Sequence, residues 1–213
     1  MLSSRRTGWF AFAALTGAVF GGAVVHAGDA TEEPAPDAPI VAIWQIERID
    51  FAYSSINVRY ACGNLQRRIA AILQAVGAHS TIGVELGCRS GELVRYANVH
   101  LTLAVPVEAS EENVRAATDF GTRDELVARL RHSQLPTAND IERFPASWRT
   151  VSLTRSPPLS LGPGDCELLR AMRDEVFPRL RVRVVSSGLR CGAGADTRIT
   201  PRIHVNALIP SRT

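Results

Sequence analysis

The sequence contains no lysine, so its 24 basic residues are all arginine, and they stand against 21 acidic residues. The resulting formal net charge of +3 is small for a chain of 213 residues. Basic and aromatic residues are not interleaved either, so we expect no nucleic-acid partner. We attribute the absence of lysine to the coding composition of the gene in preference to a functional cause.

The short motifs that mark well-known chemistries are also missing. There is no Gly-x-Ser-x-Gly, no His-Glu-x-x-His and no phosphate-binding loop ending in Gly-Lys. The acidic residues are scattered, without a pair whose spacing indicates a general acid and a general base. These absences favour a non-enzymatic protein without a cofactor.

The first 27 residues predict an export signal. Arg5 and Arg6 precede an apolar run from Trp9 to Val25, and Ala27 supplies the small residue that a signal peptidase needs. After cleavage no stable membrane span is expected, and the mature protein is periplasmic or secreted. The alternative is an uncleaved anchor, because the apolar run is nearly long enough to span a bilayer. Residues 28–39 are acidic and proline-rich, which predicts a disordered linker.

Beyond the linker, rare residue types recur at an offset of 104 residues. Trp44 matches Trp148, Cys62 matches Cys166, His100 matches His204 and Pro106 matches Pro210. Cys88 and Cys191 miss this offset by one residue. A shared offset for residues this scarce predicts a tandem duplication. It divides the chain into repeat 1 (40–107), a connecting helical segment (108–146) and repeat 2 (147–213).

Each repeat has the pattern of strands, one helix and two further strands, so the predicted fold class is α+β. Apolar residues at helical spacing mark one buried face in each helix. They are Leu65, Ile69, Ile72, Leu73 and Val76 in repeat 1, and Leu168, Leu169, Met172 and Val176 in repeat 2. The pattern specifies neither the strand order nor whether the repeats form one pseudo-symmetric domain or two lobes.

The connecting segment predicts an acidic loop followed by one helix. Thr122 and Glu125 have the spacing of a capping box at its start. Leu126, Val127 and Leu130 give this helix an apolar face.

Four cysteines in an exported chain are expected to form disulfides. Three pairings are possible, and the repeat favours Cys62 with Cys88 and Cys166 with Cys191. A helix of about 15 residues rises roughly 22 Å, and a strand of about seven residues returns roughly the same distance. The end of the returning strand therefore comes back to the start of the helix, where the partner cysteine lies.

Three arginines are the candidate binding residues. Arg179, Arg181 and Arg183 alternate with apolar residues, so the sequence predicts a basic strip on one strand. This strip would bind an anionic partner in the cell envelope, such as a protein, a glycan or an anionic lipid. The alternative is a solvated face that protects an edge strand. Repeat 1 has Ala75, Gly77 and His79 at these positions, so the strip does not belong to the repeated pattern.

Two histidines and two tryptophans are weaker candidates. His100 and His204 lie on matching strands and point away from the core, so they could approach each other across a pseudo-twofold axis. Zinc needs three or four ligands, and we therefore predict no metal site, with solvent-facing histidines as the preferred interpretation. We interpret Trp44 and Trp148 as paired residues of the core, in preference to a platform on which a ligand stacks.

These observations predict an exported, non-enzymatic binding or assembly module of the bacterial cell envelope. The alternative is a small metal-dependent or hydrolytic enzyme that uses His100 and His204. The sequence does not identify the partner.

Overall fold

The structure is a computed structural model, and it describes residues 38–154, 159–191 and 200–211. The predicted export signal and most of the predicted linker lie outside these residues. The fold class is α+β, as predicted, and the chain contains two disulfides.

The elements up to residue 108 form a strand, helix, strand, strand series with one small additional two-stranded sheet. They are β1 (Ile40–Ser54), β2 (Tyr60–Ala61), α1 (Cys62–Ala75), β3 (Ile82–Leu86), β4 (Leu93–Val94) and β5 (Tyr96–Glu108). Two short helices follow, α2 (Glu111–Ala117) and α3 (Thr122–Leu130).

The elements after residue 142 repeat the strand, helix, strand, strand order. They are β6 (Arg143–Leu153), the 3₁₀ turn η1 (Pro163–Asp165), α4 (Cys166–Ala171), the π-helix η2 (Met172–Val176), β7 (Arg183–Ser187) and β8 (Ile203–Pro210). We call residues 40–108 the first half and residues 143–210 the second half.

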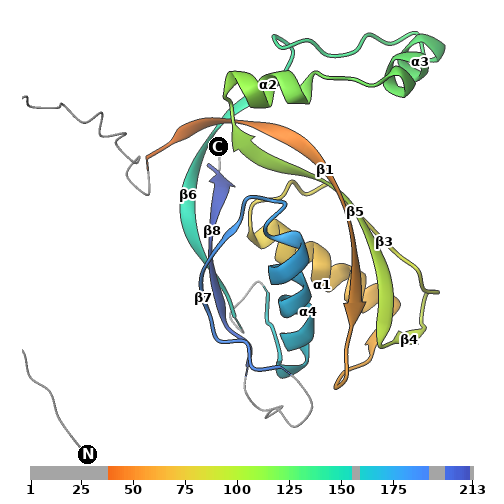
Figure 1. Ribbon diagram of the computed structural model, residues 1–213, viewed down its shortest axis with the longest axis vertical. Coiled ribbons are helices and arrows are strands. Elements are labelled where there is room, and N and C mark those ends of the chain that lie inside the picture. The colour runs from red at the N-terminus through yellow and green to blue at the C-terminus, as the bar shows by residue number, and fades with distance from the viewer. Residues whose placement is uncertain (1–37, 155–158, 192–199, 212–213) are drawn as a thin grey trace, which may run out of the picture. The chain divides into compact units, whose positions relative to one another are not determined.

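One six-stranded sheet with the order β3-β5-β1-β6-β8-β7 joins the two halves. Each of its five ladders is antiparallel. Within this sheet the two halves meet through the short ladder between Ile40–Ile43 of β1 and Arg143–Ala146 of β6. From this junction the two sets of three strands diverge as two arms, visible on the right and left of Figure 1.

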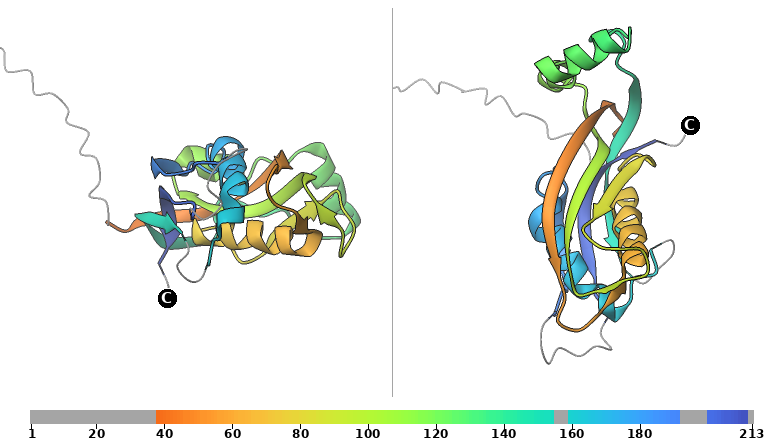
Figure 2. Two further views of the ribbon diagram at one scale, coloured as in Figure 1. Left: turned by 90° about the horizontal axis from the view of Figure 1, so that it is seen from below. Right: turned by 90° about the vertical axis from the view of Figure 1, so that its right-hand side faces the viewer.

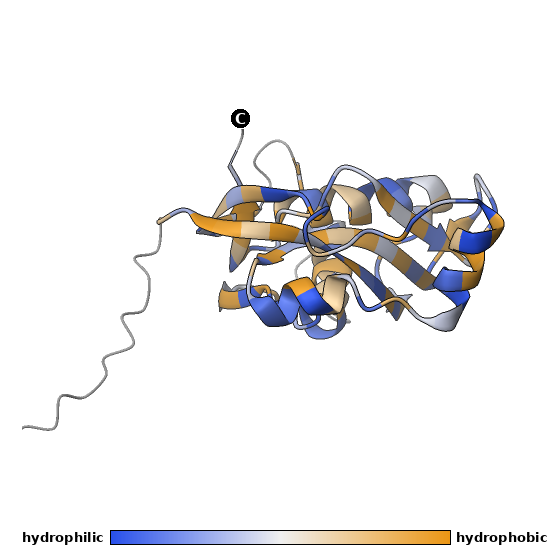
Figure 3. Cartoon of the chain, turned by 90° about the horizontal axis from the view of Figure 1, so that it is seen from above, coloured by the Kyte–Doolittle hydropathy of each residue, from blue (hydrophilic) through white to orange (hydrophobic). Residues whose placement is uncertain are grey.

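Both main helices lie between these arms (Figures 1 and 2). The α4 helix contacts β1 of the first half, and α1 contacts β3 and also β6 of the second half. Alternate residues of β5 from Ala97 to Val107 are buried on this inner face, while Tyr96, Asn98 and His100 are exposed on the other. The alternation appears as apolar and polar bands along the strands in Figure 3. A single apolar core thus receives residues from both halves.

The two main helices end with the same backbone motif. After α1, the amide of Ala78 donates to the carbonyl of Leu73 at 3.1 Å, and Gly77 has a φ of 95°. After η2, the amide of Val182 donates to the carbonyl of Phe177 at 3.0 Å, and Arg181 has a φ of 57°. Both are Schellman motifs, in which the left-handed residue is ordinarily glycine.

Gly77 also has a packing reason to be glycine. A Cβ atom at this position would lie 2.4 Å from the carbonyl oxygen of Leu208 in β8. The end of α1 therefore packs directly against the backbone of the second half.

Strand pairing differs by two residues between the halves when residues 104 positions apart are compared. Trp44 lies opposite Pro106, whereas Trp148 lies opposite Leu208. A shift of two residues keeps each side chain on its face of the sheet. The inward and outward pattern is therefore preserved although the opposing residues are not.

The small two-stranded β2–β4 sheet was not expected from the sequence. Tyr60 pairs with Val94 and Ala61 with Leu93. Two-residue strands have no periodicity to detect. Their pairing places Cys62 at the start of α1, beside this small sheet.

The predicted capping box is wrong. The N-cap of α3 is Gly121, Thr122 is already helical, and no side-chain cap is formed. The segment predicted as an acidic loop contains α2 instead, whose N-cap Ser110 accepts a hydrogen bond from the amide of Asn113 at 3.3 Å.

The apolar face of α3 points into solvent. Leu126 is 53% exposed and Leu130 is 81% exposed, while Ala128 is the buried residue of this helix. We expect Leu130→Ala to change the free energy of unfolding by less than about 0.5 kcal/mol, because no contact with the core is lost. Urea unfolding followed by circular dichroism measures this. A loss above about 1 kcal/mol would mean that α3 packs against the protein in solution.

Among the residues that the structure describes, no helix combines the length and the apolar character that crossing a membrane requires.

Candidate functional site

The four cysteines form the two predicted disulfides. Cys62 bonds Cys88 with a Cα–Cα distance of 6.1 Å, and Cys166 bonds Cys191 with a Cα–Cα distance of 5.6 Å. In each pair the first cysteine opens a helix and the second follows the next strand of the sheet, so the predicted connection of helix start to strand end is confirmed. Two disulfides indicate an oxidising, extracytoplasmic environment.

The three candidate arginines do not lie on one strand as predicted. Only Arg183 belongs to β7, whereas Arg179 and Arg181 lie in the Schellman motif that ends the preceding helix. The alternation was misleading because this turn buries Leu180 and Val182 and leaves the residue between them exposed. A strand would give the same alternation of buried and exposed residues. All three arginine side chains are exposed nevertheless.

A buried asparagine orients Arg181. Asn113 of α2 is 7% exposed, and its Oδ1 accepts a hydrogen bond from Nη2 of Arg181 at 3.2 Å. The Nδ2 of the same amide donates to the carbonyl of Glu108 at 2.8 Å, which fixes which end of the amide faces the guanidinium. The connecting segment thus supplies the group that positions an arginine of the second half.

Arg181 borders a cavity of about 90 Å³, here called the junction cavity, where the two halves meet. The cavity lies next to the end of β5 and to the turn after η2. Its apolar lining comes from both halves and consists of Val76, Val105, Pro106, Val107, Trp148, Leu180, Val182 and Leu208. Its polar lining consists of Glu108, Asn113 and Arg181.

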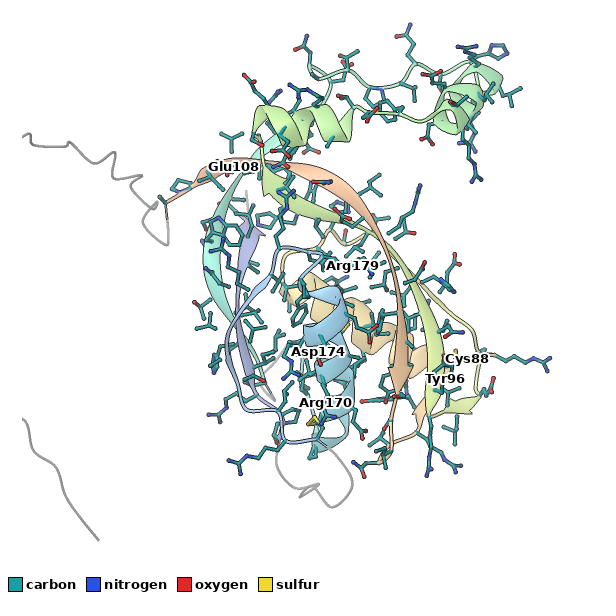
Figure 4. The ribbon with its side chains drawn as sticks, viewed as in Figure 1. Cys88, Tyr96, Glu108, Arg170, Asp174 and Arg179 are labelled. Atoms are coloured by element: carbon teal, nitrogen blue, oxygen red, sulfur yellow. A yellow bond between two sulfur atoms is a disulfide. The ribbon has the colours of Figure 1, made fainter. Side chains whose placement is uncertain are left out.

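Within the described residues, no carboxylate lies within ion-pair distance of Arg179, Arg181 or Arg183. Glu108 is the acidic residue of the junction cavity, and Figure 4 shows it at the end of β5, away from Arg179 at the end of the α4–η2 helix. The lining of the cavity thus contains one cation, Arg181, and one anion, Glu108.

A second polar cluster lies at the start of α4 and connects the two halves. Glu167 is 8% exposed, and its carboxylate accepts hydrogen bonds from the Ser55 hydroxyl, from the amide of Ile56 at 3.1 Å and from Nδ2 of Asn57 at 3.2 Å. Its carboxylate thus closes the turn that follows β1.

Asp165 completes this cluster, which we call the inter-half cluster (Ser55, Tyr60, Arg68, Asp165 and Glu167). Asp165 is 2% exposed and accepts hydrogen bonds from the Tyr60 hydroxyl and from the amide of Gly162 at 2.6 Å. Nε of Arg68 lies 3.2 Å from its Oδ1. The Asp165 side chain therefore caps the η1 turn, and Asp165 is also the N-cap residue of α4 without a side-chain hydrogen bond to that helix.

Two tyrosines near this cluster stay neutral. Burial raises the pKa of Tyr53 to about 12. Burial, together with the hydrogen bond to Asp165, raises the pKa of Tyr60 further. Tyr60 is thus a hydrogen-bond donor at neutral pH. Because every carboxylate oxygen of the cluster already accepts a hydrogen bond from the protein itself, we interpret the cluster as a structural connection between the halves.

The two histidines occupy different surroundings. Nδ1 of His100 lies 2.7 Å from Oδ1 of Asp50, the residue opposite it on β1. His204 lies on β8 opposite Ser152 and Ser186, with β1 and β6 between its strand and that of His100. The described residues contain no group of three or more side chains of the kinds that hold a metal ion.

Both tryptophans are partly buried. Trp44 packs against His79 and Phe144, with ring centroids 5.0 and 4.5 Å apart, and Trp148 lines the junction cavity. The two tryptophans, which are 104 residues apart in the sequence, therefore have different neighbours.

Sequence reasoning missed Asn113, Glu108 and the inter-half cluster. Asn113 belongs to a helix that was predicted as a loop, and Asp165 and Glu167 are separated by 97 to 112 residues from the first-half groups that they contact. The signal that could have revealed α2 is Ser110 followed by two glutamates, a common helix start.

Comparison of this chain with protein-family models, with curated proteins and with solved structures found no match.

Proposed function

We propose that this protein is an exported, non-enzymatic binding module of the cell envelope that recognises an anionic group on an envelope protein, glycan or lipid. The observation that carries the proposal is the group of three exposed arginines without an acidic partner among the described residues, of which Arg181 borders the junction cavity. Guanidinium groups free of internal ion pairs are suited to carboxylate and phosphate recognition.

Export is supported by the signal-like first 27 residues and by the two disulfides. Disulfides persist in oxidising compartments, so a periplasmic or secreted location fits both features.

The two halves, in our proposal, descend from one duplicated unit. Gly77 and Arg181 are 104 residues apart and occupy the same place in the same helix-ending motif. Val41 and Pro145 are also 104 residues apart and lie opposite each other in the β1–β6 ladder, as expected for residues next to a pseudo-twofold axis. A duplication explains why a chain of this kind carries one disulfide per half at the same place in the fold.

Replacing Arg179, Arg181 and Arg183 together by glutamine is expected to abolish recovery of the partner. The reason is the loss of three charge-assisted contacts, each contributing about 1.5–3 kcal/mol. The measurement is in-cell crosslinking of the exported protein, followed by affinity capture and mass spectrometry.

A matched control replaces Arg48, Arg89 and Arg95 by glutamine. These three arginines are exposed elsewhere on the first half, so the net charge falls by the same amount. Equal recovery of the partner by the wild type and the first triple variant would remove the arginine group from the proposed function. An equal loss of partner recovery in both triple variants would show that recognition depends on the net charge of the protein and not on the position of the arginines.

The enzyme alternative is tested by metal analysis of protein purified without an affinity tag. Stoichiometric zinc or copper that disappears in the His100→Ala, His204→Ala double variant would favour it over the binding module.

A further inference from the structure

We propose that the junction cavity and Arg181 together bind a carboxylate carried next to a short branched aliphatic group. This inference rests on the proposed function and names the ligand chemistry of the same site. The carboxylate pairs with the Arg181 guanidinium, and the aliphatic group fills the apolar cavity between the halves.

The backbone conformation of Arg181 is the first argument. A left-handed residue at the end of a helix is ordinarily glycine, and a side chain there costs roughly 1 kcal/mol. The equivalent position in the first half is Gly77. The fold itself does not require an arginine at this position, so the guanidinium is the feature that the second half gains.

The orientation of the guanidinium is the second argument. The buried amide of Asn113 accepts one N–H of Arg181 at 3.2 Å and is itself held by the carbonyl of Glu108. A guanidinium carries five N–H donors, so a hydrogen bond to one of them restricts its orientation and leaves others for a ligand. Prepositioned donors of this kind lower the ordering cost of binding.

The cavity sets the size of the aliphatic group. Its volume of about 90 Å³ is smaller than the roughly 150 Å³ of a cavity that holds benzene. A branched group such as isopropyl or isobutyl therefore fits better than an aromatic ring. The lining by valine and leucine side chains provides apolar contact on several sides.

Glu108 opposes an anionic ligand, since it also borders the cavity. Its backbone carbonyl is needed to hold Asn113, but its exposed carboxylate is not. We therefore expect Glu108→Gln to tighten binding several-fold.

Two compounds with the same terminal chemistry test the proposal: N-acetyl-leucine and a hexapeptide that ends in leucine with a free carboxylate. Isothermal titration calorimetry with the purified protein measures both affinities. We expect binding of at least one compound, weakened about 10- to 100-fold in Arg181→Gly, as for the loss of one charge-assisted contact. The hexapeptide with a C-terminal amide should be weakened to a similar extent.

Arg181→Gly is chosen because glycine fits the left-handed conformation, so the variant is expected to fold with an unchanged or raised unfolding midpoint. Arg48→Gln removes the same charge at an exposed site of the first half that does not line the cavity, and it should change the affinity less than threefold. Binding of the peptide alone would identify a chain terminus as the source of the carboxylate, and binding of both compounds would identify free branched acids as well. No binding by the wild type up to millimolar concentrations, or equal binding by Arg181→Gly, overturns the proposal.

The two proposals fail in different ways. If the triple arginine variant loses its crosslinked partner while the wild type binds neither compound, only the ligand chemistry is wrong. If that variant keeps its partner while N-acetyl-leucine binds the wild type through Arg181, the proposed function is wrong and the ligand chemistry stands.

Discussion

Replacing Asp165 by alanine is expected to lower the free energy of unfolding by about 3 kcal/mol. Its carboxylate is 2% exposed and accepts the amide of Gly162 at 2.6 Å and the hydroxyl of Tyr60, while Arg68 lies 3.2 Å away. Alanine leaves all three donors without this partner in a site that water reaches poorly. Because Arg68 keeps its hydrogen bond to the Leu159 carbonyl and is partly exposed, the loss stays below that of a fully buried ion pair.

Asp174→Ala provides the matched control. Asp174 also pairs with an arginine, at 2.6 Å from Arg173, but this pair lies at the surface. Exposed pairs contribute little, so the expected change is below about 0.5 kcal/mol. Urea unfolding followed by circular dichroism compares the two variants. An equally small effect of both would show that the inter-half cluster does not hold the two halves together.

The elements that the sequence predicted well are those with a strong local pattern. The buried face of α1 from Leu65 to Leu73 follows the 3.6-residue period of a helix, as the sequence predicted. Both disulfides were predicted because the 104-residue offset selected one pairing and the lengths of helix and strand agreed with it. The recurrence of rare residues at one offset is a long-range signal that a single sequence can reveal.

The predictions that were wrong concern segments whose pattern of apolar residues fits two different structures. Residues 179–183 alternate between exposed and buried, which a strand explains and a helix-ending turn explains equally. The apolar residues of α3 have helical spacing, but spacing does not say what covers them, and Leu130 is 81% exposed.

The two polar sites could not be predicted for a different reason. Neither Asp165 with Tyr60 nor Arg181 with Asn113 is close in sequence, and contacts of this kind depend on how the arms of the sheet are placed. Neither of these polar sites is marked by a periodic residue pattern, so the sequence gives no local signal for it. The 104-residue offset nevertheless draws attention to Arg181, because the residue at that offset in the first half is Gly77.

Removing either disulfide is expected to lower the free energy of unfolding by about 3.5 kcal/mol, with Cys62→Ala, Cys88→Ala for one and Cys166→Ala, Cys191→Ala for the other. The bridges span 26 and 25 residues, so the loop entropy that each removes from the unfolded chain is almost the same. Alanine avoids placing a hydroxyl at the buried position of Cys62. Urea unfolding of both double variants measures the two losses.

The two losses should be nearly additive, because each bridge closes a loop within its own half and the loops do not overlap. A variant without any cysteine would then lose about 7 kcal/mol, which is comparable to the whole stability of an ordinary domain. We therefore expect that variant to be largely unfolded, while each double variant remains folded. Peptide mapping of the wild type under non-reducing conditions is the control for the pairing. Sulfurs joined between the halves would contradict both the pairing and the expected equality of the two losses.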